Sequence, residues 1–263
     1  MKIEEIKAEL NTRIIGREII YYPETTSTND VAIELAEKGA EEGTVVLADN
    51  QTMGRGRRGR KWLAPPKTCI LASMILRPSL PLKYINIITP VAVTSVAKAI
   101  NSITKLDAYI KWPNDVIINK RKVCGILTET RMGRIRFVVV GIGINVNIAK
   151  DSIPDEISDI ATSLSIESGY NISRIHILGE ILRNFERRYL EINEKTYGEF
   201  FDEWKSLSAT IGRKVQIESE NVIKQGTALD IDEVGALIVR LDEGEILRIA
   251  NDDLARVSNV QER

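Results

Sequence analysis

The sequence has one histidine, two cysteines and few aromatic residues, 5% in all. His176 lies in a run typical of a helix and far from any motif, so we expect neither a Ser-His-Asp triad nor a histidine-rich metal site. Cys69 and Cys124 stand in apolar surroundings without metal-ligand spacing, which is typical of reduced thiols in a cytoplasmic protein. The chemistry is therefore expected to depend on lysine, arginine, aspartate and asparagine.

An excess of one charge and a long apolar run are missing as well. Lys and Arg number 36 against 37 Asp and Glu, and the net charge of −1 argues against general binding of polyanions. The N-terminus, M-K-I-E-E-I-K-A-E-L, lacks the apolar core of a signal peptide. We find no run long and apolar enough to predict a membrane span. Any anion site must therefore be a local patch.

The strongest local patch is residues 51–62, which read Q-T-M-G-R-G-R-R-G-R-K-W, with three glycines, five cations and no acid. Glycines leave backbone N–H groups unshielded, and arginines bind phosphate or carboxylate oxygens in pairs. The pattern fits a phosphate-binding loop, a nucleic-acid patch or a solvated basic loop, and the stretch alone does not separate them. Because like charges repel, we expect the loop to be mobile until an anion binds.

Hydrophobic periodicity predicts helices and strands in alternation, followed by a different texture. The expected elements are a helix at 2–10, a strand at 19–22, a helix from Ser27 to Gly39 opened by a Ser27–Asp30 capping box, strands at 44–48 and 69–76, a helix at 84–103, strands around 109–119 and after 122, a strand at 135–148, and a helix at 173–192. From Ile211 onward, short alternating runs separated by glycine-containing turns predict a small β-barrel. We therefore expect a main domain at 1–209 and a small C-terminal domain at 210–263.

Two lysines flank predicted turns. The proline of K-W-P-N-D favours a tight corner between two strands, with Lys111 and Asp115 at its sides. Lys122 follows a second turn, where a solvated lysine is common. Gly125 favours the other interpretation, because a glycine inside a strand is typical of close approach by a ligand.

The strand at 135–148 has two unlike faces. Its isoleucines and valines point one way, while Gly141, Gly143, Asn145 and Asn147 point the other. The second face suits a flat ligand lying against the backbone, next to a polar or metal-bound group. A β-bulge with exposed asparagines would give the same pattern.

Five motifs, taken in order, resemble the biotin protein ligases. They are S-T-N at 27–29, the whole block at 51–62, K-W-P-N-D at 111–115, K-V-C-G-I-L at 122–127 and G-I-G-I-N at 141–145. The resemblance covers nearly the whole chain and implies an α+β fold: a mixed β-sheet packed with helices, as in the class II synthetase-like biotin and lipoate ligases, plus a small C-terminal SH3-like β-barrel. The N-terminal DNA-binding domain of the repressor-type members has no counterpart here. The resemblance is therefore to the short form, for which we expect no sequence-specific DNA binding.

The resemblance implies a two-step ligase reaction. Biotin and ATP give biotinyl-5′-AMP, and a lysine of a biotin carboxyl carrier protein then takes the biotinyl group. Mg²⁺, a homodimeric state and a cytoplasmic location are part of the same expectation. The alternatives are a lipoate–protein ligase, whose pocket needs no partners for a ureido ring, and a non-catalytic nucleic-acid-binding protein that uses the basic loop.

The matching motifs also imply roles for individual residues. Lys122 is expected to lie between the biotin carboxylate and the α-phosphate, with Lys111 as a second cation and Arg57 as a latch on the closed loop. The residues implied for biotin are Ser27, Thr28, Asn29, Gln51, Gly54, Arg55, Gly56, Arg57, Lys122, Gly125, Gly141 and Gly143. Those implied for ATP are Arg55, Arg57, Arg60, Trp62, Lys111, Asn114, Asn145 and Arg256. Asp115 and Asn145 carry the oxygen atoms that Mg²⁺ prefers.

Overall fold

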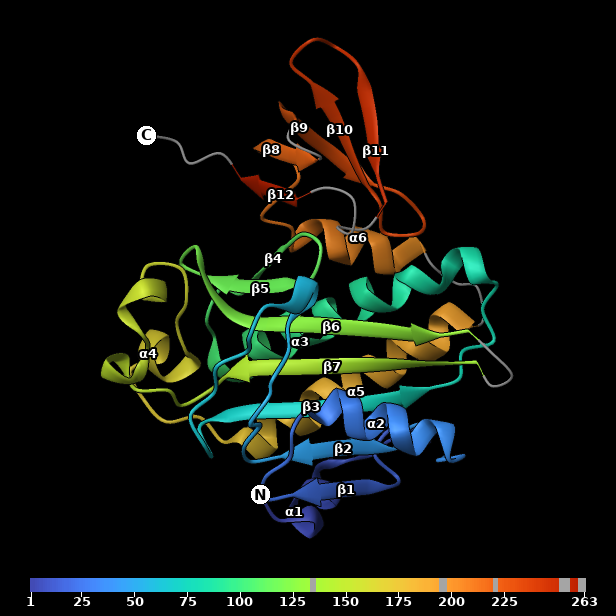
Figure 1. Ribbon diagram of the computed structural model, residues 1–263, viewed down its shortest axis with the longest axis vertical. Helices are drawn as coiled ribbons and strands as arrows, with labels where there is room; N and C mark the ends of the chain where they lie inside the picture. Colours follow the sequence, from blue (N-terminus) through green and yellow to red (C-terminus); the bar gives the residue numbers. More distant parts are fainter. Residues whose placement is uncertain (133–135, 194–197, 220–221, 251–255, 260–263) are drawn as a thin grey trace.

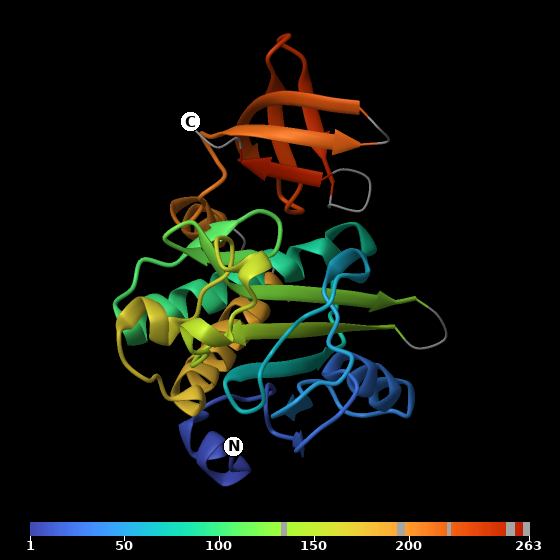
Figure 2. The ribbon, with the colours of Figure 1, turned by 60° about the vertical axis from the view of Figure 1, so that its left-hand side comes forward.

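The computed structural model describes residues 1–132, 136–193, 198–219, 222–250 and 256–259. A mixed sheet has seven strands in the order β1-β2-β3-β7-β6-β5-β4, and a second sheet has five in the order β11-β10-β9-β8-β12. Figures 1 and 2 show the second sheet, formed by the end of the chain, above the first. β1 pairs in parallel with β2, and the other pairings in both sheets are antiparallel. The expected α+β class with a mixed sheet is confirmed.

The elements follow the chain closely. The first sheet consists of β1 (Ile19–Tyr22), β2 (Val45–Ala48), β3 (Cys69–Leu76), β4 (Tyr109–Lys111), β5 (Asp115–Ile118), β6 (Arg121–Arg131) and β7 (Phe137–Asn145). The α-helices are α1 (Ile3–Glu9), α2 (Thr28–Glu37), α3 (Ile88–Thr104), α4 (Leu164–Ser168), α5 (Arg174–Asn193) and α6 (Gly198–Ser206). Short 3₁₀ turns are η1 (Arg57–Gly59), η2 (Leu82–Ile87), η3 (Lys150–Ser152) and η4 (Asp155–Ile157). The second sheet consists of β8 (Lys214–Ser219), β9 (Val222–Ile231), β10 (Leu237–Leu241), β11 (Ile246–Ile249) and β12 (Arg256–Asn259).

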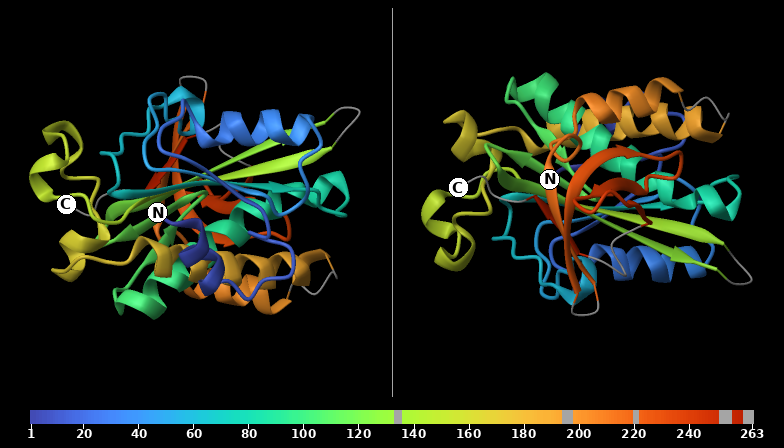
Figure 3. Two further views of the ribbon diagram at one scale, coloured as in Figure 1. Left: turned by 90° about the horizontal axis from the view of Figure 1, so that it is seen from below. Right: turned by 90° about the horizontal axis from the view of Figure 1, so that it is seen from above.

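The two faces of the first sheet are covered unequally. α3 and α5 pack on one face, and α2 lies on the opposite face (Figure 3). Alternation along β7 divides its side chains between them: Val140 and Ile142 join the core under α3 and α5, whereas Val139 joins a smaller cluster under α2. α2 covers only part of its face, so the stretch of β3, β6 and β7 beyond its N-terminus is left for other side chains.

The helical stretch formed by η2 and α3 bears on the expectation that no run is long and apolar enough to span a membrane. Residues Leu82–Thr104 form one helical stretch that contains an 18-residue window with a mean hydropathy of 1.3, long and apolar enough by length and composition alone. Its most apolar window is 72% buried within the protein. The apolar character is therefore explained by packing in the core of the fold.

The start of α2 differs from the predicted capping box. Ser27 is the N-cap residue, but its side chain makes no capping hydrogen bond. The backbone N–H of Thr28 donates instead to Gln51 Oε1 at 2.7 Å. Asp30 is used elsewhere, in an ion pair with Arg55. The cap of α2 thus comes from a residue that follows β2.

Residues 207–210 join the two sheets at the edge strand β4. The N–H of Ile110 donates to the Leu207 carbonyl, and the N–H of Ala209 donates to the Ile110 carbonyl, both at 2.8 Å. Without these two bonds, the backbone N–H and carbonyl of Ile110 would have no partner on the free edge of β4. The domain boundary expected between residues 209 and 210 lies within this joint and stays a prediction.

One buried carboxylate holds the N-terminal segment onto α5. Glu186 is 6% exposed and accepts from the backbone N–H groups of Arg13, Ile14 and Ile15 at 2.6, 2.6 and 2.8 Å. The three bonds replace a helical or sheet partner for a segment that has neither.

We expect Glu186→Gln to lower the free energy of unfolding by about 2–4 kcal/mol, because its amide NH₂ turns a donor toward backbone donors and leaves buried N–H groups unmatched. Urea denaturation measures the change. Glu37→Gln, at an exposed site in the last turn of α2, is the matched control and should change stability by less than about 0.5 kcal/mol. Equal stabilities of the two variants would contradict the assignment.

Candidate functional site

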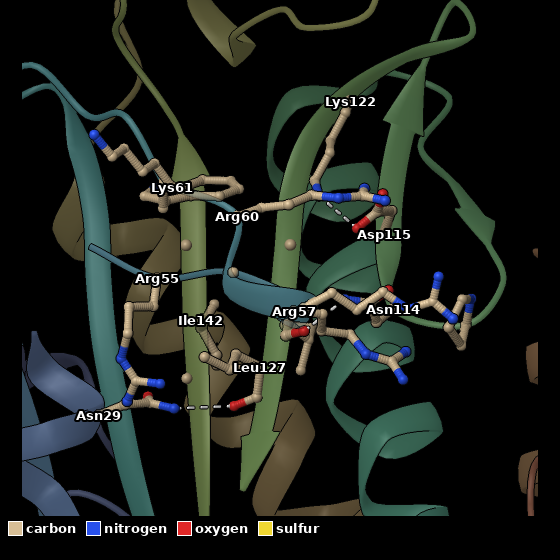
Figure 4. Close-up of a pocket in the computed structure, with 18 of the residues that line it drawn as sticks. Asn29, Arg55, Arg57, Arg60, Lys61, Asn114, Asp115, Lys122, Leu127 and Ile142 are labelled. Atoms are coloured by element: carbon tan, nitrogen blue, oxygen red, sulfur yellow. Dashed lines mark hydrogen bonds and ion pairs between the residues drawn. The ribbon is translucent and has the colours of Figure 1, made fainter. Parts of the chain in front are cut away.

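A pocket of about 210 Å³ lies on the part of the sheet that α2 leaves uncovered. The residues that line it come from the start of α2, the loop at 51–62, the corner between β4 and β5, and strands β3, β6, β7 and β12. Sixteen of the predicted site residues are among them: Ser27, Thr28, Asn29, Gln51, Arg55, Gly56, Arg57, Arg60, Trp62, Lys111, Asn114, Asp115, Lys122, Gly125, Gly141 and Gly143. Segments far apart in sequence thus meet at one place, as Figure 4 shows.

Uncharged polar groups form a chain at one end of the pocket. Ser73 Oγ donates to Thr28 Oγ1 at 2.8 Å, and Thr28 Oγ1 donates to Gln51 Oε1 at 3.0 Å. Gln51 Oε1 also accepts from the Thr28 N–H, which fixes the orientation of the amide and leaves its NH₂ group on the other side. Ser73 was missed by the motif analysis, although its hydroxyl interrupts the apolar run C-I-L-A-S-M-I-L.

Asn29 is fully engaged within the protein. Its Oδ1 accepts from Ser73 at 2.6 Å, so that Asn29 and Thr28 share the single hydroxyl proton of Ser73. Its Nδ2 donates to Glu129 at 2.8 Å and to the Leu127 carbonyl at 3.3 Å. A Cβ on Gly141 would lie 2.2 Å from Asn29 Oδ1. Gly141 therefore makes room for Asn29, and it also lines the pocket, so the expectation that a ligand lies close to it stays a prediction.

Trp62 occupies the space above the other two strand glycines. Gly125 and Gly143 are paired in register across β6 and β7. A Cβ on Gly125 would lie 3.0 Å from the indole, and one on Gly143 would lie 2.7 Å from it. The flat surface that the glycines predicted is present, but in this structure the indole lies on it. Lys122 Nζ is 5.5 Å from the centre of the ring, within the range of a cation–π contact.

The loop at 51–62 folds back on itself as a short hairpin. The N–H of Gly56 donates to the Arg60 carbonyl at 2.7 Å, and the N–H of Trp62 donates to the Gly54 carbonyl at 2.9 Å. Gly54 does not line the pocket. Its role is in the hairpin, because a Cβ at this position would lie 2.8 Å from the Trp62 carbonyl and would keep the two arms apart. The expectation that the empty loop is mobile stays a prediction.

Arg55 already has anionic partners within the protein. Its guanidinium forms ion pairs with Asp30 and, at 3.3 Å, with Glu129. Burial alone would lower the pKa of Arg55, but the hydrogen bonds and charges of the two carboxylates outweigh it and raise that pKa. Figure 4 shows Arg55 directed toward Asn29 and away from Lys122. The sequence predicts that this arginine binds the ligand and does not reveal its two acidic partners, because both lie outside the loop.

Cations gather at the opposite end of the pocket. Lys122 is in strand β6 and not in a solvated turn, and its Nζ lies 2.6 Å from Asp115 Oδ1. Lys111 faces Asp115 in register across β4 and β5. Arg57 and Arg60 line the same pocket, and Figure 4 shows Arg60 extending toward the Lys122–Asp115 pair.

The backbone of Lys122 is held on two sides. It pairs with β5, and on the other side its N–H donates to the Ile160 carbonyl at 2.8 Å while its carbonyl accepts from the Thr162 N–H at 2.9 Å. Residues 160–162 thus act as a short additional strand beside β6. The side chain of Lys122 consequently starts from a fixed backbone position.

Asn145 and Asn114 are both hydrogen-bonded within the protein, and the side chain of a third predicted residue, Arg256, is not described. Asn145 is 8% exposed and does not line the pocket; its Nδ2 donates to the Thr162 carbonyl at 3.0 Å. Asn114 lines the pocket, but its Nδ2 donates to the Ile126 carbonyl at 2.7 Å. Arg256 begins β12, and its side chain lies outside the described residues. The same strand contributes Val257 and Ser258 to the lining, which the sequence analysis did not predict.

The residues do not form a site for a metal held by the protein alone. Asp115 is paired with Lys122, and the amide of Asn145 is bonded away from the pocket. In the part of the chain that the structure describes, no group of three or more His, Cys, Asp or Glu residues converges. The two cysteines do not contribute either: burial raises the pKa of Cys69 to about 11 and also raises that of Cys124.

Comparisons with known proteins agree with this geometry. Residues 21–147 match the Biotin/lipoate A/B protein ligase family, and residues 210–250 match the Biotin protein ligase C terminal domain. The chain is 40% identical over 252 residues to the bifunctional ligase/repressor BirA of Bacillus spizizenii, covering 95% of this chain and 77% of that one. It is 30% identical to the biotin–[acetyl-CoA-carboxylase] ligase of Mycobacterium tuberculosis, with 92% of each chain covered.

A solved structure gives the same result for the fold. The biotin protein ligase from Aquifex aeolicus, in complex with biotin and ATP, superposes with a TM-score of 0.79 at 31% identity, covering 93% of this chain and 100% of that one. Sequence and structure therefore agree over both sheets. The chain belongs to the biotin protein ligase family.

Proposed function

We propose that this protein activates biotin with ATP to biotinyl-5′-AMP and transfers the biotinyl group to a lysine of a biotin carboxyl carrier protein. The observation that carries the proposal is the division of one pocket into two ends. At one end Thr28 and Gln51, which line the pocket, offer a hydroxyl and an amide group to a ureido ring, and the buried Ser73 holds Thr28 from behind. The other end gathers Lys122 and Lys111 with arginines from the loop.

The first step brings two anions together. A carboxylate oxygen of biotin attacks the α-phosphorus of ATP, and the bond from that phosphorus to the pyrophosphate oxygen breaks. The negative charges of carboxylate and phosphate repel in a pocket from which water is partly excluded, so the protein must supply positive charge between them. Lys122 is the residue we assign to this position, with Lys111 and Arg57 beside it.

The second step needs no further cofactor. The uncharged amine of the carrier lysine attacks the acyl carbon of biotinyl-5′-AMP, the bond from carbon to phosphate oxygen breaks, and AMP leaves. The nitrogen loses a proton as the amide forms. Because the mixed anhydride reacts with water, the loop at 51–62 must cover it until the carrier arrives.

Mg²⁺, the oligomeric state, the location and the domain division complete the proposal. Since the protein offers no converging metal ligands among its described residues, we propose that Mg²⁺ arrives with ATP and is held mainly by the phosphates. We propose a homodimer in the cytoplasm, with a catalytic domain at 1–209 and a small domain at 210–263. The net charge of −1 gives no support to general binding of DNA or acidic membranes.

Release of pyrophosphate tests the first step directly. With ATP and Mg²⁺ present, biotin should give rapid release and lipoate should give little, because a lipoyl group leaves the ureido partners unmatched. Labelled biotin should then appear on a carrier domain and not on a carrier with the target lysine changed to arginine. A preference for lipoate would overturn the proposal in favour of a lipoate–protein ligase.

Limited trypsin digestion tests the expected closure of the loop. We expect rapid cleavage between Arg55 and Lys61 in the free protein and strong protection when biotin and ATP are both present, since biotinyl-5′-AMP supplies the anion that the cations need. Arg57→Gly should release the intermediate faster. Biotin alone and ATP alone serve as controls. An unchanged cleavage rate with both ligands would show that the loop is a static charged patch.

A further inference from the structure

Trp112 connects the corner between β4 and β5 to the C-terminal part of the chain. It is 4% exposed and lies between Lys111 and Asp115, at the cationic end of the pocket. Its backbone N–H donates to Thr210 Oγ1 at 3.0 Å, and its indole Nε1–H donates to the Gly235 carbonyl at 3.0 Å. One corner of the pocket is therefore bonded both to the joint before β8 and to the turn between β9 and β10.

The turn that receives Trp112 is rigidly built. Asp232 Oδ1 accepts from the N–H groups of Val234 and Ala236 at 3.0 and 2.9 Å, and Asp232 Oδ2 pairs with Arg248 at 2.6 Å. Gly235 has a φ of +82°, and a Cβ there would lie 2.8 Å from Pro90 in α3. A residue with a side chain would thus be strained and would push the turn away from α3. Glycine lets the turn dock and present its carbonyl to the indole.

The opposite side of the corner carries the charges of the pocket. Asp115 faces Lys111 across β4 and β5 and forms the ion pair with Lys122 at 2.6 Å. Asn114 is bonded to Ile126 of β6 through both its side chain and its backbone, at 2.7 and 2.9 Å. The corner therefore lies between β6 on one side and the turn at 232–236 on the other, and its position depends on both.

We infer that Trp112 is a positioning residue through which the C-terminal sheet fixes the cationic end of the pocket. The inference rests on the proposed ligase function and adds to it a role for the C-terminal sheet in the ATP half of the site. The biotin end is built independently, because the hydrogen bonds of Ser73, Thr28 and Gln51 join α2, β3 and the residues after β2. A change that loosens the corner should therefore lower kcat/KM for ATP and leave the affinity for biotin unchanged.

Variants at Trp112 and Thr210 test the inference. Trp112→Phe keeps an aromatic ring in the buried site but removes the donor to Gly235. We expect kcat/KM for ATP in biotin-dependent pyrophosphate release to fall about tenfold, the effect of one unmatched buried polar group. The Kd of biotin, measured by calorimetry, should stay within about twofold of the wild-type value, because a change of that size means almost no change in binding free energy. Thr210→Val should show the same pattern, and Thr210→Ser, which keeps the acceptor hydroxyl, should restore activity.

A change in the C-terminal sheet completes the test. Gly235→Ala should reproduce the loss for ATP, although residue 235 is 123 positions from Trp112 along the chain. Combined with Trp112→Phe it should add little, because both changes break the same contact. Three results would overturn the inference. They are equal losses of biotin affinity and of kcat/KM for ATP, a Thr210→Ser variant as impaired as Thr210→Val, and a double variant whose loss is the product of the two single losses. If the wild-type protein released no pyrophosphate in the presence of biotin, the proposed function itself would be overturned.

Discussion

Lys122→Ala should slow biotinyl-5′-AMP formation by about a hundredfold or more, the usual effect of removing a charge that stabilises a transition state. Lys122 starts from a β6 backbone held on both sides, and its Nζ reaches the cationic end of the pocket. Without that cation, the carboxylate of biotin and the α-phosphate of ATP meet unscreened. Pre-steady-state pyrophosphate release with both substrates saturating measures the loss.

The ion pair with Asp115 suggests a second explanation for such a loss, and a double variant separates the two. If Lys122 only neutralised Asp115, then Lys122→Ala together with Asp115→Asn would recover most of the rate. We expect no recovery, because the missing charge acts on the substrates. Lys150→Ala, at an exposed site in η3, is the matched control and should retain full activity. Near-normal release by Lys122→Ala would remove Lys122 from the mechanism.

Gln51→Glu should lower the affinity for biotin by about tenfold or more while leaving the affinity for ATP almost unchanged. The carboxylate keeps an oxygen to accept the Thr28 N–H, so the start of α2 remains capped. It lacks the NH₂ group that we assign to the ureido carbonyl, and it places a negative charge there instead. Calorimetric titration with each ligand separates the two effects.

Further variants distinguish binding from capping. Gln51→Ala should lose biotin affinity and also some thermal stability, because it removes the cap of α2 as well. Thr28→Val should weaken biotin by breaking the chain from Ser73 to Gln51. If Gln51→Glu bound biotin normally and only Gln51→Ala failed, Gln51 would be a structural cap and nothing more.

Local patterns predicted the elements well but not what fills the space between them. The strand at 69–76 is present with those bounds, and the alternation along β7 places Gly141 and Gly143 on the face expected. The occupants of that face were not predicted, because Asn29 and Trp62 reach it from distant parts of the chain. Periodicity reports how a segment meets its surroundings, and it carries no information on which segment supplies them.

The assignments of individual charges show the same limit. The basic loop predicts that Arg55 binds the ligand, but the sequence does not show that Arg55 also pairs with Glu129, 74 positions away. Lys122 looked like a turn residue because the turn signal precedes it, yet β6 begins one residue earlier. Motif order identified the family without this information, since the motifs report which residue types the pocket needs and not how each one is bonded.

The clamp of Glu186 on residues 13–15 has a consequence for how the chain is made. The bonded groups are 171 to 173 positions apart, so the N-terminal segment cannot find its partner until α5 has left the ribosome. At about 5–20 residues per second, that delay is on the order of 10–35 seconds. During that time Ile14 and Ile15 lack the contacts that bury them in the folded protein, and transiently exposed apolar side chains of this kind favour association between nascent chains.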